Sequence, residues 1–392
     1  MSDITMAPYT PNARCGIWIV CGPEWADWDL NRIVARDGAL ALDSTVDSTP
    51  VSDPTGTAGD LTHPEAPASS MPPALTVHGV ATGPECDTPL GFTSLVASWN
   101  AETAPGTQIV ISARAKMSDH WTGWFVMGRW SGPGTGSSVE RQFSPDGEVK
   151  VDTLDLHRPA YACQFRAELW GRAGASVRVT LASLCWYNPA VECPPPPAVE
   201  GSWARVLRVP CRSQRLQDRN ISDSACSPTS LSMILGFYGI DRRPADVAAG
   251  VHDEAADIFG NWPMNTAYSA ACGCPAYVGR FWCLEQLQAE IAAGRPVEVS
   301  IRFGKGELDG APLRYSRGHL VVVIGFASSG DVVVNDPAAP TESSVQRVYS
   351  RQQFEKAWIG GSGGIAYIVL PRPPEGLGRP RTGHSNIRKD LE

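Results

Sequence analysis

A cysteine at the start of a predicted helix is the first residue of this chain whose surroundings suit a nucleophile. Cys226 opens a segment in which apolar residues recur at helical spacing from Leu231 to Tyr238. Pro228 suits the first turn of a helix, and Gly239 suits its end. The positive end of a helix favours a thiolate, which is the form of cysteine that attacks a carbonyl group.

A histidine and an aspartate lie at the two ends of a predicted β-hairpin. His319 begins an apolar run that ends at Phe326, Gly330 turns the chain, and Asp336 ends the next run. Antiparallel pairing places the start of one strand beside the end of the next, so we expect His319 and Asp336 to be neighbours. The carboxylate would fix the imidazole tautomer and leave the other ring nitrogen for the thiol of Cys226.

Each of these three residues also has an ordinary structural explanation. Buried structural cysteines, histidines at strand edges and aspartates in turns before proline are common in any fold. The combination of all three, in the order Cys226, His319 and Asp336 on a helix start and a returning strand pair, favours the chemical explanation. The pattern therefore predicts a thiol-dependent acyl-transfer site.

Length and composition are those of an ordinary globular protein with two domains. The chain has 392 residues, of which 43% are hydrophobic and 19% charged. The net charge of −8 argues against a nucleic-acid binder. No apolar run is long enough for a membrane span, and the first residues lack the pattern of a secretory signal. We therefore expect a cytoplasmic protein, with secretion as the alternative.

The chain divides into five predicted segments, and its predicted fold class is α+β. Residues 1–75 form an N-terminal segment whose end, from residue 44, is a linker rich in Ser, Thr, Pro, Gly and Asp. Residues 76–192 contain short alternating apolar runs separated by turns and predict an antiparallel β-sandwich. Residues 193–200 are a proline-rich spacer, residues 201–372 a mixed catalytic domain, and residues 373–392 a disordered tail. The individual strands are expected at residues 16–20, 108–114, 124–130, 164–170 and 177–181.

Residues 209–370 resemble the C39-like cysteine peptidases of the papain-like superfamily. The resemblance is carried by six ordered pieces: Val-Pro-Cys-Arg-Ser-Gln at 209–214, Cys-Ser-Pro-Thr-Ser-Leu at 226–231, Gly-Asn-Trp-Pro-Met-Asn-Thr-Ala-Tyr at 260–268, Gly-Arg-Pro-Val at 294–297, Gly-His-Leu at 318–320 and Val-Asn-Asp-Pro at 334–337. The chain is most similar to two-domain bacterial members that carry a β-rich domain ahead of the peptidase. Ser227 departs from the family pattern, in which glycine commonly follows the nucleophile.

The resemblance implies a papain-like fold, in which a helical subdomain around the cysteine packs on an antiparallel sheet that bears the histidine and the aspartate. It also implies an oxyanion-hole glutamine ahead of the nucleophile. Gln214 matches that motif, and Gln217 is the fallback. Trp262 and Asn265 lie in another matching piece and are candidates for lining the substrate groove, with a conformational role as the alternative.

The predicted reaction is hydrolysis of a peptide or amide bond through a thioester acyl-enzyme. His319 deprotonates Cys226, Asp336 orients His319, and Gln214 holds the oxyanion. Neither a cofactor nor a metal is predicted. Two alternatives stay open: a papain-like acyltransferase or cyclase that uses the same residues with another acceptor, and a non-catalytic binding module with a relict triad.

Four tryptophans stand out in the β-rich region. Trp99, Trp121, Trp124 and Trp130 suggest a platform for a sugar, and packing in a β-sheet core is the alternative. The expected partners are therefore a peptide or amide substrate and a carbohydrate or protein ligand of the β-rich domain, and not a nucleic acid.

Two further features leave alternatives open. Arg302, Lys305, Arg314 and Arg317 precede His319, and they could bind an acidic group of the substrate or form a solvated loop. The eleven cysteines could pair as disulfides, but buried thiols are the favoured interpretation because no secretory signal is seen.

Overall fold

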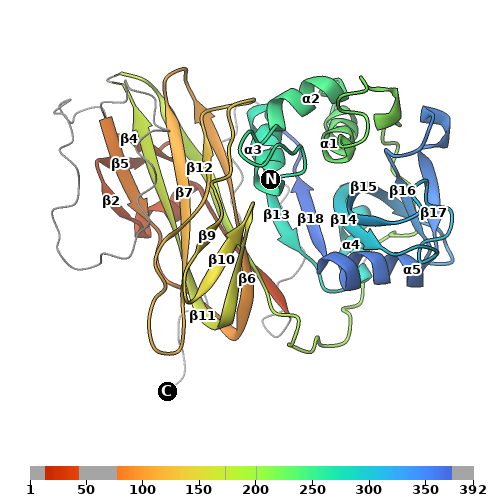
Figure 1. The fold of residues 1–392 in the computed structure, drawn as a ribbon, viewed down its shortest axis with the longest axis horizontal. Helices are drawn as coiled ribbons and strands as arrows, with labels where there is room; N and C mark the ends of the chain where they lie inside the picture. Colours follow the sequence, from red (N-terminus) through yellow and green to blue (C-terminus); the bar gives the residue numbers. More distant parts are fainter. Residues whose placement is uncertain (1–13, 44–76, 173, 200, 373–392) are drawn as a thin grey trace.

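A computed structural model of the protein describes residues 14–43, 77–172, 174–199 and 201–372. Within these residues the molecule has a large antiparallel β region followed by a region that contains helices and a second antiparallel sheet (Figure 1). The predicted linker at 44–75 and the predicted tail at 373–392 lie outside the described residues.

The N-terminal region is a twelve-stranded antiparallel arrangement around two long strands, β6 and β11. Its strands are β1 (Cys15–Cys21), β2 (Asp29–Asn31), β3 (Ile33–Arg36), β4 (Ala39–Leu42), β5 (Val77–Thr82), β6 (Cys86–Thr103), β7 (Gln108–Lys116), β8 (Phe125–Trp130), β9 (Gln142–Phe143), β10 (Gly147–Lys150), β11 (Thr153–Gly171) and β12 (Val177–Tyr187). A short 3-10 helix, η1 (Gly22–Asp27), follows β1. Alternate residues of β5 are buried, as expected for a strand with one face toward the core.

The boundary predicted at residue 76 does not separate two structural units. β1 pairs along its whole length with β12, from Cys15 opposite Tyr187 to Cys21 opposite Leu181. β4 also pairs with β12, and β2 pairs with β5. Residues 15–42 therefore complete the sheet that the later strands begin. Sequence patterns missed this because the partners are separated by the Ser- and Pro-rich stretch and by most of the region itself.

The expected strands are present, and some are longer than their patterns indicated. The runs at 16–20, 108–114, 124–130 and 177–181 fall in β1, β7, β8 and β12, and the run at 164–170 is the second half of β11. β11 shifts register against β6 between Asp155 and Ala162. Such irregularities bend a strand and break its alternation, so its first half gave no clear signal.

The four tryptophans of this region fall into two pairs. Trp99 and Trp130 are fully buried and belong to the core. Trp121 and Trp124 are half-buried, and the Arg114 guanidinium lies 4.5 Å and 4.7 Å from their ring centroids. A carbohydrate or protein ligand of this region stays a prediction, and Trp121 and Trp124 are its remaining aromatic candidates.

The C-terminal region has helices on the faces of a six-stranded antiparallel sheet. The helices are α1 (Cys226–Phe237), α2 (Pro244–Val251), α3 (Trp262–Ala271), α4 (Leu284–Ala292) and α5 (Arg351–Glu355), which continues into the π-helical turn η5 (Lys356–Gly360). The strands are β13 (Ala276–Arg280), β14 (Val297–Phe303), β15 (Ser316–Phe326), β16 (Val332–Asn335), β17 (Gln346–Tyr349) and β18 (Ile365–Val369), in the order β13-β18-β14-β15-β16-β17. Two 3-10 helices, η3 (Gln214–Leu216) and η4 (Glu342–Ser344), lie in its loops.

The two regions meet where the edge strand β13 and helix α3 lie beside β6 and β12 (Figure 1). Asn100 of β6 donates to the carbonyl of Ala276 at 2.6 Å and accepts from its amide at 3.1 Å. Ser98 accepts from the amide of Val278 at 3.0 Å. An edge strand exposes unpaired backbone groups, and side chains of the N-terminal region satisfy those of β13. The two regions therefore share one hydrophobic core.

The described residues contain neither a membrane-spanning helix nor a disulfide. No helix among them is both long and apolar enough to cross a membrane. All eleven cysteines lie in this part of the chain, and all are free thiols.

Candidate active site

Cys226 is the first residue of α1, as its surroundings predicted. Almost every residue of the helix is buried, and the helix packs against β15. The hydroxyl of Ser230 donates to the carbonyl of Leu320 at 3.2 Å, which ties the first turn to the residue after His319. The thiol of Cys226 is half-buried and lies at the helix N-terminus, where unpaired amide groups favour negative charge.

His319 and Asp336 are buried neighbours, as the hairpin predicted. The Nε2 atom of His319 lies 2.8 Å from Oδ1 of Asp336, and the two residues are 2% and 1% exposed. β15 carries His319, and Asp336 directly follows β16, which pairs with β15. The hydrogen bond to Asp336 leaves the Nδ1 side of the ring for Cys226, whose thiol is hydrogen-bonded to His319.

The charges of these groups support one another. Burial lowers the pKa of His319, but the charge of Asp336 and hydrogen bonds to Asp336 and Cys226 outweigh burial and raise the pKa to about 10. Burial raises the pKa of Cys226, but the hydrogen bond and charge of His319 outweigh it, so the pKa of the thiol is lowered. The arrangement thus favours a thiolate beside an imidazolium.

Tyr349 completes the surroundings of Asp336 and was not predicted. Its hydroxyl donates to Oδ2 of Asp336 at 2.7 Å, and the amide of Ala338 donates to Oδ1 at 2.9 Å. Burial raises the pKa of Asp336, but the charge of His319 and these hydrogen bonds outweigh burial and lower it. Tyr349 lies at the end of β17, and only the pairing of β17 with β16 brings it here.

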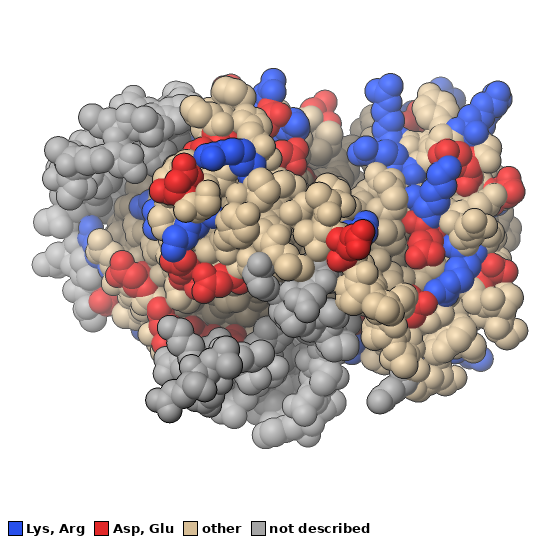
Figure 2. Space-filling view, turned by 90° about the horizontal axis from the view of Figure 1, so that it is seen from below, with Lys and Arg blue, Asp and Glu red and all other residues tan. Residues whose placement is uncertain are grey.

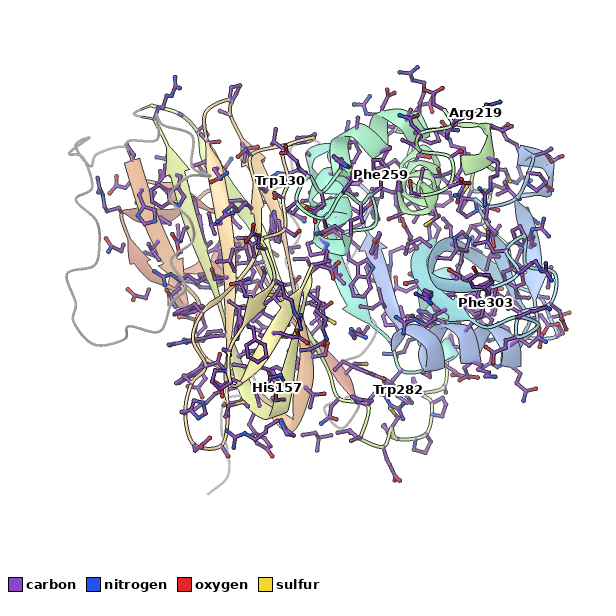
Figure 3. All side chains as sticks on the ribbon, in the orientation of Figure 1. Trp130, His157, Arg219, Phe259, Trp282 and Phe303 are labelled. Atoms are coloured by element: carbon purple, nitrogen blue, oxygen red, sulfur yellow. The ribbon has the colours of Figure 1, made fainter. Side chains whose placement is uncertain are left out.

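Gln214 connects the aspartate loop with the segment that leads to the cysteine. Its backbone amide donates to the carbonyl of Pro337 at 2.9 Å, and its side-chain Nε2 donates to the carbonyl of Ser222 at 2.9 Å. The side chain is buried, and its Oε1 has no hydrogen-bond partner among the residues that the structure describes. The fallback residue, Gln217, instead donates back to the carbonyl of Ser213. In the sequence, Arg219 falls between these glutamines and Cys226. Figure 3 shows it on the side of the C-terminal region that faces away from the N-terminal region.

Trp262 and Asn265 have structural surroundings, and their place in a substrate groove stays a prediction. Asn265 is fully buried on α3, and its side-chain Nδ2 donates to the carbonyls of Asn261 and Phe259 at 2.8 Å and 2.9 Å. Trp262 packs on a small cluster shared by the two regions, and its backbone amide donates to Asp152 of the N-terminal region at 2.9 Å. Both residues therefore hold α3 in place, which is the conformational alternative.

A buried glutamate lies beneath the nucleophile and was missed by the sequence patterns. Glu298 of β14 is fully buried, and its Oε1 accepts from the hydroxyl of Ser227 at 3.0 Å. The same hydroxyl lies 3.1 Å from that of Tyr367. Burial raises the pKa of Glu298 well above its usual range, and the charge of Cys226 adds to this. Ser227, the departure from the family pattern, therefore has a partner that glycine would lack.

Replacing Glu298 with Gln tests whether this carboxyl group is neutral. A raised pKa means that folding stability falls with rising pH above about 4.3, the usual Glu pKa, because ionisation costs more in the folded state. Glu298→Gln should therefore become more stable relative to wild type as pH rises, by up to about 1.4 kcal/mol per pH unit in that window. Urea unfolding at pH 5 and pH 8 measures this.

The same change at an exposed residue, Glu254→Gln, is the control for Glu298→Gln. A stability difference between Glu298→Gln and wild type that stays constant with pH would show that the pKa of Glu298 is not raised. An ionised Glu298 would also raise the pKa of Cys226, so its replacement would then move thiol reactivity to lower pH.

No metal site is formed by the part of the chain that the structure describes, since no three His, Cys, Asp or Glu side chains there are arranged to hold an ion.

Two family models match the chain, one in each region. Residues 206–364 match the family model of the Peptidase_C39 like family, and residues 21–187 match that of the Peptidase C39 N-terminal domain. Among solved structures, the chain is similar to a protein described as a C39-like peptidase from Bacillus anthracis, with 19% identity, a TM-score of 0.33, and coverage of 43% of this chain and 98% of that one. It is also similar to carbohydrate-binding modules of the β-sandwich superfamily, with 17% identity, a TM-score of 0.15, and coverage of 26% and 40%.

These structural similarities are too low to carry an argument, and no curated protein matches the chain. The two family models cover different parts of the chain, in the order N-terminal domain and then peptidase-like domain. Residues 206–364 are therefore a Peptidase_C39-like domain, preceded at residues 21–187 by a Peptidase C39 N-terminal domain.

Proposed function

We propose that this protein is a papain-like cysteine peptidase or amidase in which Cys226, His319 and Asp336 form a catalytic triad. The observation that carries the proposal is the buried hydrogen bond between His319 and Asp336, beside a half-buried thiol whose pKa His319 lowers. A structural cysteine needs neither a helix N-terminus nor a histidine whose other nitrogen is held by a carboxylate. The Peptidase_C39-like domain supports the same reading.

Each group has a role in the proposed reaction. The thiolate of Cys226 attacks the carbonyl carbon of a peptide or amide, and the imidazolium of His319 gives its proton to the leaving amine. Asp336, held by Tyr349, keeps the imidazole in the required tautomer. Water, deprotonated by His319, then attacks the thioester and releases the acid.

The oxyanion of the tetrahedral intermediate needs hydrogen-bond donors. The backbone amide of Cys226 and the side-chain amide of Gln214 are the proposed donors. One N–H group of Gln214 is held by Ser222, four residues ahead of the nucleophile, which leaves the other for the oxyanion. Replacement of Gln214 should therefore lower the rate of the chemical step.

The pH dependence of Cys226 alkylation is the first test of the proposal. A lowered thiol pKa predicts that Cys226 reacts with iodoacetamide at pH 6 at least about tenfold faster than an ordinary thiol of pKa about 8.5. We expect the ion pair to persist until His319 loses its proton near pH 10. Peptide mass spectrometry reports each cysteine separately, so the half-buried Cys211 and Cys272 are internal controls.

His319→Ala should remove this reactivity at pH 6 because the thiolate loses its counter-charge. If Cys226 instead reacts like Cys272 in both proteins, the ion pair does not exist, and the binding module with a relict triad becomes the better explanation.

A second experiment tests the reaction itself. Acid quenching during turnover of a peptide or amide should trap an acyl group on Cys226, which mass spectrometry detects as a thioester. Adding an amine such as glycinamide separates hydrolysis from acyl transfer. A free acid as the main product supports the hydrolase, whereas an amide as the main product supports the transferase.

A further inference from the structure

A pocket with an unusual charge lies at the end of the β14–β15 hairpin where the connecting loop joins the two strands. It has a volume of about 670 Å³ and is open to solvent. Its lining includes the cationic side chains of Arg302, Lys305, Arg317 and Lys356. Glu307 is the only acidic residue in the lining. Figure 2 shows Lys and Arg side chains spread over the C-terminal region in the view from below.

The acidic residue of the lining is already engaged. One oxygen of Glu307 pairs with Lys356 at 2.9 Å, and the other accepts from the amide of Gly304 at 2.6 Å. Arg302, Lys305 and Arg317 form no ion pair with any described residue. Three cations without a counter-charge on a chain of net charge −8 create a local positive field, which attracts an anionic group.

The pocket begins beside the catalytic pair. Ile301 of β14 is paired directly with His319, and Arg302 is the next residue. Glu298, Ser300 and Arg302 alternate onto one face of β14, and Glu298 on that face bonds to Ser227, the neighbour of Cys226. By this alternation Arg302 shares the face of Glu298, whereas the directly paired Ile301 and His319 share the other face of the sheet.

A β-bulge shapes this end of the hairpin. Register shifts between Ile301 and Phe303, so Arg317 and Gly318 lie opposite Arg302 alone. The side chain of Arg302 donates to the carbonyl of Arg317 at 3.0 Å, which fixes the two arginines together. Figure 3 shows Phe303, another lining residue, on the side of the C-terminal region away from the N-terminal region, so the pocket is not part of the contact between them.

The geometry points to a subsite that binds a carboxylate of the substrate, and we propose that the substrates are peptides or amides with an acidic group close to the scissile bond. This inference rests on the proposed function of Cys226. An extended chain advances about 3.3 Å per residue, so moving an acidic group along a peptide by one residue at a time changes its distance from the attacked carbonyl in steps of that size. A guanidinium group binds a carboxylate with two parallel hydrogen bonds, which suits Arg302 and Arg317.

The test uses matched peptides in which one position carries Glu or Gln, moved in turn along the sequence, with a free or amidated C-terminus. For one position near the scissile bond, kcat/KM should be at least about tenfold higher for Glu than for Gln, which is the effect of one well-formed ion pair of about 1.4 kcal/mol. If the free C-terminus alone confers the preference, the recognised group is the terminal carboxylate rather than a side chain. The preference should fall with added NaCl.

Charge reversal identifies the pocket as its source. Arg302→Glu and Arg317→Glu should each remove or invert the preference. Lys305→Glu should reduce it as well. The Lys305 side chain forms no hydrogen bond with any described residue, so a lost preference in this variant cannot come from a broken hydrogen bond. Arg208→Glu, the same change at an exposed arginine outside the pocket, should leave the preference unchanged. Thermal melting confirms that each variant is folded.

A binding measurement makes the result independent of turnover. In Cys226→Ala, which cannot react, Glu peptides should bind at least about tenfold more tightly than their Gln counterparts. Equal binding of the two, or a preference that survives charge reversal, overturns the acidic subsite. Failure of the proposed function is a separate outcome, seen as an unreactive Cys226 in the wild-type protein whatever the peptides do.

Discussion

Replacing Cys226 with Ala is expected to lower kcat/KM for amide hydrolysis by about 10⁴-fold or more. Without the thiol no acyl-enzyme forms, and the remaining groups can only bind the substrate and stabilise an oxyanion that is not produced. His319→Ala should cost about as much, since the thiol then lacks both its base and its counter-charge. The double variant should be little worse than either single one, because the two residues act as a unit.

The control for this prediction is Cys272→Ala, which removes another half-buried thiol of the same region and should leave the rate unchanged. Tyr349→Phe should have a smaller effect, because Asp336 keeps its bonds to His319 and Ala338. Activity that survives in Cys226→Ala would mean that another residue carries the reaction, and the triad would have to be abandoned.

Replacing Asn100 with Ala is expected to destabilise the whole protein by about 2–5 kcal/mol. Asn100 is 2% exposed, and it satisfies both the carbonyl and the amide of Ala276 on the edge strand β13. Each buried backbone group left without a partner costs about 1–3 kcal/mol. The loss should appear as an earlier urea transition followed by tryptophan fluorescence.

The same experiment tests whether the two regions unfold together. Since they share one hydrophobic core, fluorescence and far-ultraviolet circular dichroism should report a single coincident transition. Asn31→Ala, a change at an exposed asparagine of the same N-terminal region, should stay within about 0.5 kcal/mol of wild type. A wild-type transition in Asn100→Ala, or separate transitions for the two regions, would show that the contact contributes little.

The contact between the regions gives the N-terminal region a structural role. Asn100 and Ser98 cover the edge of β13, and Asp152 accepts from the first amide of α3. Burial raises the pKa of Asp152 to about 6, although the hydrogen bond from Trp262 opposes this. The C39 N-terminal domain thus completes the fold of the domain that carries Cys226.

Local sequence signals were sufficient for the reacting groups. The helix that begins at Cys226 has its own apolar spacing and its own start and stop residues, and these act within a few positions. The strand that begins at His319 and the turn at Gly330 likewise specify a hairpin from neighbouring residues. Hairpin geometry then places Asp336 beside His319 without information from the rest of the chain.

Other features depend on contacts between residues far apart in the chain, for which no local signal exists. Ser227 and Glu298 are 71 positions apart, and their bond requires α1 to lie on β14. The same holds for Tyr349, which reaches Asp336 only through the pairing of β17 with β16. Residues of this kind look like ordinary core residues in the sequence.

Two sets of aromatic and polar residues suggested ligand contacts in the sequence, but the sequence could not show whether they are buried. Trp99 and Trp130 are compatible with a sugar platform in the sequence, as Trp262 and Asn265 are with a substrate groove, but the structure buries or packs them. Residue type and spacing therefore determined where the residues of the proposed triad lie, because short-range propensities set the helix start and the hairpin. Only the tertiary structure decided which polar and aromatic side chains face solvent and which support the site, because burial depends on what the rest of the chain packs against them.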